Sequence, residues 1–265
     1  MPRDEAARGG RLPPPPHTGN PREPCDRGFF RRGASVAGHH GCEDAVVSAA
    51  KATEPESARV VRRIRDEILD GVRTPGSKLV ERDIADELGV SRVPVRDALK
   101  VLETEGLVTL RPRTWAVVRE FTADDITDLI ELRSAVEPLT FELVARRHTG
   151  DGLARLRATV DAELGAARAG DATVARRAAA DFHEVATELS GNLLLVEWMQ
   201  TMRSRMRWLM SQHDDVLGVA LEHQELYGAV ADRDIPRVSH LVARHLANNR
   251  LPGAADVEAT SAERP

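Results

Sequence analysis

Apolar residues recur at a helical spacing along most of the chain after residue 57. They stand three and four positions apart, which places their side chains on one face of a helix. Residues 58–70 predict a first helix, and Gly71 ends it. A second, short helix carries Ile84, Ala85 and Leu88 on one side. The regular structure is therefore expected to begin with two helices.

A glycine and a capping residue separate this short helix from a third one. Gly89 stands where a helix often ends in a left-handed residue, which glycine adopts without steric cost. Ser91 follows at an N-cap position, and Pro94 falls in the first turn, where its missing N–H does no harm. The third helix has this apolar stripe: Val95, Ala98, Leu99 and Leu102. Two helices joined by a tight turn predict a helix-turn-helix.

Two short β-prone segments follow Gly106 and predict a hairpin. They cover residues 107–110 and 116–118, with a turn between them. A hairpin at this place is the wing of a winged helix-turn-helix, a fold that sets one helix into the major groove of DNA. Arg111 and Arg113 in the turn suit a narrow, negatively charged minor groove.

The exposed side of the third helix carries Arg92, Arg96 and Lys100. Arg92 stands at the helix start, where recognition helices meet base edges. Acidic residues of the first two helices offset most arginines of the domain, so its total charge does not argue for DNA. Only the local placement of the arginines does. The alternative is a small helical domain whose arginines lie on a solvated face.

From Thr122 onward the pattern changes to long helices. Residues 122–125 resemble a capping box that opens a helix. Five further helical segments follow, separated by glycines or polar breaks: 151–169, 171–190, 192–212, 214–231 and 234–249. Six helices with short loops predict an antiparallel bundle. The expected fold class is therefore mainly α, a winged helix-turn-helix followed by an all-α bundle.

Three bundle helices each carry one histidine within the apolar stripe: His183, His223 and His245. A lone histidine there is usually a satisfied core residue, but three in one bundle must each find a buried partner. A divalent metal can satisfy imidazole nitrogens on facing helices. The pattern leaves a metal or ligand cavity and an ordinary core as alternatives. The other histidines of this region are expected to be solvated: His148, His213 and His240.

Arg133 lies on the apolar face of the first bundle helix. A guanidinium is not left unpaired in a core. It either pairs with Glu137, one turn further on, or holds an anionic ligand through two hydrogen bonds. The sequence favours the pair with Glu137.

Composition limits the class of protein further. The 265 residues suffice for two modest domains, and aromatic residues make up only 3%. No apolar run approaches the ~20 residues that span a bilayer, so no membrane partner is expected. Two cysteines, Cys25 and Cys42, suggest neither a disulfide framework nor a cysteine metal site. The net charge of −5 indicates only that the protein stays in solution.

The terminal segments differ from the rest of the chain. Residues 1–56 contain four successive prolines, several glycines and little apolar periodicity, and they lack the features of a secretory signal. They are expected to be disordered, as are residues 251–265, and the protein is expected in the cytoplasm. The two domains are placed at 57–120 and 121–250.

The run PGSKLVERDIADELGVSRVPVRDALKVLETEGLV closely resembles the N-terminal domain of GntR-type bacterial transcription regulators. The matching features are PG-x-x-L, E-R-x-(I/L)-A, G-V-S-R-x-P-V-R and L-x-x-x-G-L-V. The resemblance implies that three arginines contact bases or phosphates of double-stranded DNA and that one serine contacts a phosphate: Arg82, Arg92, Arg96 and Ser91. The wing departs from the family, which usually has a glycine near the tip, where this chain has Thr114 beside Trp115.

The second half resembles the FCD ligand-binding domain of the FadR subgroup in the same family. The matching residues are Leu132-Arg133, Glu137, Phe182-His183, Ser190-Gly191-Asn192, Glu222-His223 and Arg244-His245-Leu246. Together the two resemblances cover roughly residues 58–250. In that family the bundle binds a divalent metal, often zinc, through three histidines and one Asp or Asn, and small carboxylates bind at or near the metal.

The resemblance implies this site for a metal such as zinc: His183, His223 and His245. It implies effector contacts by Arg133 and Asn192. The acidic ligand should stand four residues before His183, where this chain has Ala179. Asp181 is near in sequence but points about 200° around the helix. A weakened metal site is favoured, with an organic acid bound without metal as the alternative.

These inferences predict a ligand-responsive transcription regulator rather than an enzyme. A homodimer would place two winged helices on a pseudo-palindromic operator, and a small organic acid in the bundle would shift helix packing and operator affinity. Repression is the commoner behaviour of the family. One alternative is a metal-dependent enzyme, although no acidic residue is expected on the inward faces as a general base. Another is a dimeric DNA-binding protein without an effector.

Overall fold

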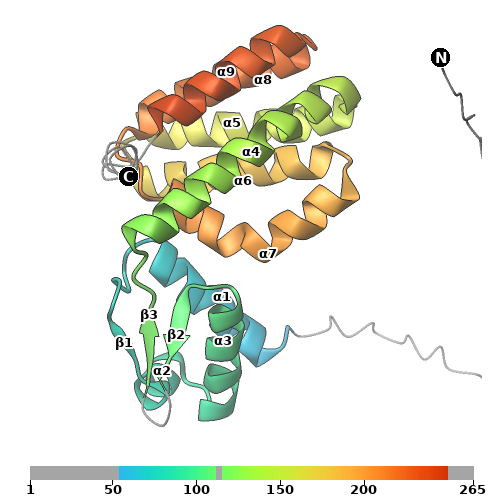
Figure 1. The fold of residues 1–265 in the computed structure, drawn as a ribbon. Helices are drawn as coiled ribbons and strands as arrows, with labels where there is room; N and C mark the ends of the chain where they lie inside the picture. Colours follow the sequence, from blue (N-terminus) through green and yellow to red (C-terminus); the bar gives the residue numbers. More distant parts are fainter. Residues whose placement is uncertain (1–53, 112–114, 250–265) are drawn as a thin grey trace, which may run out of the picture. The chain divides into compact units, whose positions relative to one another are not determined.

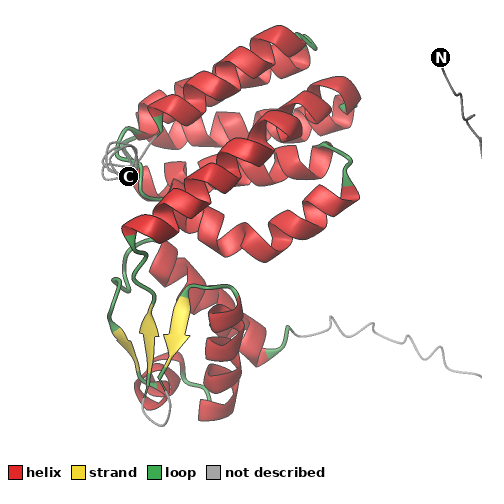
Figure 2. Ribbon diagram, in the orientation of Figure 1, coloured by secondary structure: helices red, strands yellow, loops and turns green. Residues whose placement is uncertain are grey.

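The computed structural model describes residues 54–111 and 115–249, and the mainly α fold is confirmed. Figures 1 and 2 show helices throughout, with one small sheet. Arg113, Thr114, both cysteines and the two terminal segments lie outside the described residues, so the predictions made for them stay predictions. None of the helices in the described ranges combines the length and apolar character needed to cross a membrane.

The first domain is a winged helix-turn-helix. Its helices are α1 (Glu56–Leu69), α2 (Glu81–Leu88) and α3 (Arg92–Thr104). Its strands are β1 (Lys78–Leu79), β2 (Val108–Leu110) and β3 (Ala116–Val118). They form an antiparallel sheet of order β1-β3-β2, in which Lys78 pairs with Val117 and Val108 with Val118. The sequence did not predict β1, which pairs only across the fold.

Glycines make the two tight connections around α3. Gly89 ends α2 in the left-handed conformation with φ of 64°, and Gly106 follows α3 with φ of 78°. After Gly106, the Leu107 N–H donates to Leu102 O at 3.0 Å, which satisfies a carbonyl at the helix end. Ser91 occupies the N-cap of α3 as predicted, but its hydroxyl makes no capping hydrogen bond.

The second domain is the predicted bundle of six helices. They are α4 (Ala123–Arg147), α5 (Gly150–Arg168), α6 (Ala172–Leu189), α7 (Leu193–Met210), α8 (Val216–Ala231) and α9 (Ile235–Asn248). Helix α5 packs against α6 and α8, and α4 packs against α6 and α9. The core between them includes fully buried side chains from five helices: Phe141, Val160, Phe182, Ala220, Leu226 and Val242. The three histidines belong to α6, α8 and α9, so this packing brings them together.

The predicted capping box opens the bundle. The Asp125 N–H donates to Thr122 Oγ1 at 3.1 Å, and the Thr122 N–H donates back to Asp125 Oδ2 at 3.0 Å. These bonds satisfy backbone donors that the first turn of a helix leaves free. They fix the start of α4, the helix that carries Arg133.

Candidate functional site

One groove of the first domain collects most of the predicted DNA contacts. Helices α2 and α3 and the wing strands line it, and it includes these basic residues: Arg82, Arg92, Arg96, Lys100 and Arg111. These basic residues come from three separate segments of the sequence, and the fold brings them together in one groove. Ser91 is exposed beside the groove but does not line it. This concentration of exposed cations suits a polyanion.

Glu81 holds the two arginines of the recognition helix. The Arg96 side chain donates from Nε to Glu81 Oε1 at 2.9 Å and from Nη2 to Oε2 at 2.8 Å. The Arg92 Nη2 donates to the same Oε2 at 3.3 Å. The hydrogen bonds from Arg96 lower the pKa of Glu81. In the sequence, Glu81 is only one of the acidic residues that offset the arginines, because its partner Arg96 stands 15 residues away.

The groove also contains an aromatic residue that sequence reasoning noticed only as a departure. Trp115 lines it, and the Lys78 ammonium lies 4.3 Å from the centre of the Trp115 ring. A cation over an indole face is attracted by the ring. Lys78 therefore adds a positive charge at the wing that the sequence pattern did not indicate.

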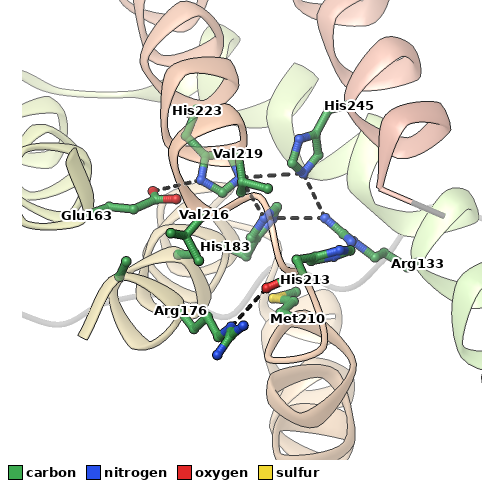
Figure 3. Close-up of a pocket in the computed structure, with 12 residues that line it drawn as sticks. Arg133, Glu163, Arg176, His183, Met210, His213, Val216, Val219, His223 and His245 are labelled. Atoms are coloured by element: carbon green, nitrogen blue, oxygen red, sulfur yellow. Dashed lines mark hydrogen bonds and ion pairs between the residues drawn. The ribbon is translucent and has the colours of Figure 1, made fainter. Parts of the chain in front are cut away.

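The three predicted histidines converge inside the bundle. His183, His223 and His245 are 4%, 1% and 2% exposed. The Nε2 atoms of His183 and His223 are 3.1 Å apart, and those of His223 and His245 are 3.4 Å apart. All three nitrogens lie within 4.8 Å of one another. Figure 3 shows the rings pointing toward one another from three helices.

A carboxylate stands behind each imidazole ring. The distances from Nδ1 to the carboxylate oxygen are 2.9 Å for His183 and Glu137, 2.8 Å for His223 and Glu163, and 2.7 Å for His245 and Glu222. The first of these contacts has the distance of a hydrogen bond but not its direction, whereas the other two have both. An Nδ1–H directed at a carboxylate leaves Nε2 as a lone pair, as in histidines that bind metals.

Arg133 occupies the remaining side of the cluster. It is 4% exposed, and its Nε donates to Glu137 Oε1 at 2.7 Å, as the sequence favoured. Its Nη2 lies 2.8 Å from His245 Nε2 and 3.5 Å from His183 Nε2. The guanidinium is thus the positive group that faces the imidazole lone pairs. Its Nη2 can therefore donate to the lone pair of His245.

Burial keeps His183 and His245 neutral, whereas the carboxyls of Glu137 and Glu222 stay ionised. Burial lowers the pKa of His183 to about 4, and burial also lowers the pKa of His245. Burial opposes ionisation of Glu137, yet Arg133 and His183 hold the pKa of that carboxyl well below its ordinary value. Burial likewise opposes ionisation of Glu222, and the hydrogen bond from His245 still lowers its pKa. Neutral imidazoles are the form that binds metal.

His183, His223 and His245 form a histidine triangle, and the cavity beside it is small. Its volume is about 10 Å³, close to the ~10–15 Å³ that holds a single water molecule. Ala179 lines it, so α6 offers no acidic side chain there. Asp181 is exposed and pairs with Arg207 instead. Asn192 caps α7 by accepting from the Leu195 N–H at 3.3 Å and does not line this cavity, so its predicted effector contact gains no support.

Two expectations about this region are wrong. His213 was expected in solvent, but it lines the cavity and its Nε2 is buried without a hydrogen-bond partner. His148 Nε2 is also buried. No acidic residue was expected on the inward faces, but Glu163 is 1% exposed and touches His223. The signal for Glu163 was its place in an otherwise apolar stripe of α5, between Val160 and Ala167.

The donor set fits a divalent cation. Two ligands bound to zinc at 2.0–2.1 Å in tetrahedral geometry are about 3.4 Å apart, close to the Nε2 separations of 3.1 and 3.4 Å in the structure. Three acidic side chains, Glu137, Glu163 and Glu222, contact the imidazoles, and one guanidinium, that of Arg133, lies among them. A divalent cation would add positive charge beside this excess of acidic groups. The histidines would hold it, and the carboxylates would orient the histidines.

A winged helix-turn-helix joined to a separate helical bundle is the domain arrangement of a DNA-binding regulator. The chain matches the family model "Bacterial regulatory proteins, gntR family" over residues 56–118 and the FCD domain over residues 128–248. It belongs to the GntR family, in the group with an FCD domain. It is a transcriptional regulator and not an enzyme.

Relatives and solved structures agree with this family. An HTH-type transcriptional regulator of Mycobacterium tuberculosis, Rv0494, is 31% identical over 71% of this chain and 85% of its own length. A probable D-xylose utilization operon transcriptional repressor of Paenarthrobacter nicotinovorans is 27% identical over 71% of this chain and 86% of its own. The crystal structure of a putative GntR regulator from Rhodococcus sp. RHA1 has a TM-score of 0.63 at 28% identity and covers 78% of this chain and 99% of that one.

Proposed function

We propose that this regulator is a repressor whose winged helix binds operator DNA and whose bundle senses a small organic acid through a bound divalent cation. The observation that carries the proposal is the convergence of three imidazole Nε2 atoms, each ring backed by a carboxylate. A core that needed only to be filled would not gather so many buried polar groups, because each of them costs desolvation.

Arg133 supports an anionic effector. In the described structure its guanidinium lies against His245 Nε2. A cation bound by the histidines would repel the guanidinium. A carboxylate that bridges the cation and Arg133 would relieve this repulsion, because it satisfies both positive groups. The effector would then bind one arrangement of the bundle better than the other, which a switch requires.

The DNA contact follows from the groove. Arg92 and Arg96 would reach base edges or phosphates from α3, while Arg82, Lys100 and Arg111 would meet the backbone. Arg113 and Ser91 remain part of this proposal as predicted contacts. A homodimer in the cytoplasm would place two such grooves on a pseudo-palindromic operator, one half-site for each. Repression is supported by the name of the Paenarthrobacter relative.

Replacing Glu81 with glutamine is expected to lower the ratio of specific to non-specific DNA affinity. The carboxylate fixes Arg96 through two hydrogen bonds, and an amide can offer only one acceptor oxygen. Losing a negative charge beside the phosphates should also strengthen non-specific binding. Fluorescence anisotropy with operator and scrambled duplexes at several salt concentrations measures both affinities. An unchanged ratio would show that Glu81 does not position Arg96. Glu87→Gln in α2 is the matched control, because Glu87 pairs with Arg73 away from the groove.

The sensor is tested by metal analysis followed by thermal unfolding. We expect the protein as purified, or after loading with zinc, to hold about one metal per chain. An organic acid at about 100 times its Kd should add about 2.7 kcal/mol of stability and raise Tm by about 5–10 °C. The acid that raises Tm should also change operator affinity. If neither a metal nor any acid stabilises the protein, the bundle serves only for assembly and the sensor proposal is wrong.

A further inference from the structure

The histidine triangle supplies only three ligands, while a tetrahedral cation takes four. Within the described residues, few other polar groups line the cavity. Arg133 and Arg176 are cations and cannot act as ligands, and Glu163 lies behind the Nδ1 side of His223, away from the shared space (Figure 3). The nitrogen donor that remains is His213. Helix α6 supplies no carboxylate ligand, because Ala175 and Ala179 face the cavity there.

His213 has the properties of a metal ligand that is not yet bound to a metal. It lies in the loop between α7 and α8, ten residues before His223, and it lines the cavity together with Arg133 (Figure 3). Its Nε2 is buried and has no hydrogen-bond partner. Burial is the main cause that lowers the pKa of His213 to about 4, and the positive charge of Arg133 lowers it too. The ring is therefore neutral. A buried nitrogen without a partner costs free energy that a bound cation would recover.

The backbone of this loop is tied to the helix that carries His183. The Arg176 Nε of α6 donates to the His213 carbonyl oxygen at 2.9 Å, and the Arg176 Nη2 lies 3.6 Å from Asp214 Oδ1. The main chain at position 213 is therefore anchored one turn of α6 away from Ala179. The His213 side chain can still change its rotamer, which moves Nε2 while the backbone of His213 stays bound to Arg176.

We propose that His213 is the fourth protein ligand of the divalent cation and closes the site when the cation binds without an effector, whose carboxylate would take the place of His213. Arg133 leaves His245 Nε2, the cation takes its place among the three imidazoles, and the His213 side chain turns inward. His213 is outside the group of nitrogens that lie within 4.8 Å of one another, so this turn is a required movement. The inference rests on the proposed metal sensor. It adds that the α7–α8 loop responds to the cation.

A cysteine at position 213 tests whether this position reaches the metal. The variant His213→Cys is made in the full chain with Cys25→Ser and Cys42→Ser, and it is titrated with cobalt(II), a spectroscopic substitute for zinc. A thiolate bound to cobalt absorbs in the near ultraviolet by sulfur-to-metal charge transfer. We expect this band in the variant and not in the parent with His213. His240→Cys on the exposed side of α9 is the matched control and should give no band.

A second measurement does not depend on a new thiol. His213→Ala is expected to lower zinc affinity at least about tenfold in competition with a chromophoric chelator, the scale seen when a group supporting a metal site is lost. His240→Ala should leave the affinity unchanged. Circular dichroism shows whether each variant is folded.

The outcomes separate the two proposals. If the parent protein binds neither cobalt nor zinc, the metal sensor fails and His213 has nothing to close. If the parent binds metal, but His213→Cys gives no charge-transfer band and His213→Ala binds zinc as tightly as the parent, then only the assignment of His213 fails. A band together with weakened zinc binding establishes His213 as a ligand.

Discussion

Replacing Arg96 with alanine is expected to weaken binding to the specific operator by about 5–150-fold, the equivalent of one bidentate base contact worth 1–3 kcal/mol. Arg96 is half exposed, points into the groove and is held by Glu81 in one arrangement, so little ordering is needed on binding. The variant also leaves the Glu81 charge facing phosphates. The measurement is the affinity for operator and for scrambled DNA at one fixed salt concentration.

A matched control separates this effect from the loss of any surface charge. Arg155 is an equally exposed arginine of the bundle, paired with Glu188 as Arg96 is paired with Glu81. Arg155→Ala should leave operator affinity unchanged. If Arg96→Ala keeps its preference for the operator while the fold is intact, α3 does not read bases through this residue, and the assignment of the recognition face is wrong.

Much of the fold could be predicted because its determinants are local. The left-handed turn at Gly89, the capping box at Thr122 and the apolar stripes are each set by residues within a few positions of one another. The strand β1 was missed because two residues carry no periodicity. Its pairing with β3 depends on residues far along the chain: Leu79 pairs with Ala116, 37 positions on, and Lys78 pairs with Val117, 39 positions on.

The candidate site divides along the same line. Periodicity alone placed His183, His223 and His245 on inward faces, and the structure brings them together. It could not assign Glu163 to His223, because these residues are 60 positions apart on different helices. It also misplaced His213, since a loop residue has no stripe from which its burial can be inferred. Local spacing therefore predicts the three histidines of the site, whereas the residues around them depend on contacts between different elements.

The family resemblance and the structure point to different consequences of Ala179. The resemblance alone indicates a metal site weakened by a missing acidic ligand. In the structure, acidic side chains instead stand behind the imidazoles: Glu137, Glu163 and Glu222. Carboxylates at this distance do not bind the cation but raise the basicity of the histidines and offset its charge. Loss of the acidic ligand at Ala179 is thus compatible with a functional cation site.

The largest effect in the bundle is expected from separating His223 from Glu163. Both side chains are 1% exposed, and the Nδ1 to Oε2 distance is 2.8 Å. His223→Leu leaves the Glu163 carboxyl buried without its partner, which should lower the free energy of unfolding by about 3 kcal/mol, where the costs of an unsatisfied buried polar group and of a broken buried pair overlap. Urea denaturation at neutral pH measures the change, with zinc removed.

The double variant His223→Leu with Glu163→Leu should recover most of that stability, because an apolar pair of similar volume often replaces a buried polar pair without loss. It should bind operator DNA and yet have lost zinc binding and the response to an organic acid. Such a result would show that the fold needs little of the pair for its stability and that the pair is kept for sensing. If the double variant is as unstable as His223→Leu alone, or still binds zinc like the parent, the pair is structural, and the metal sensor must be sought elsewhere in the bundle.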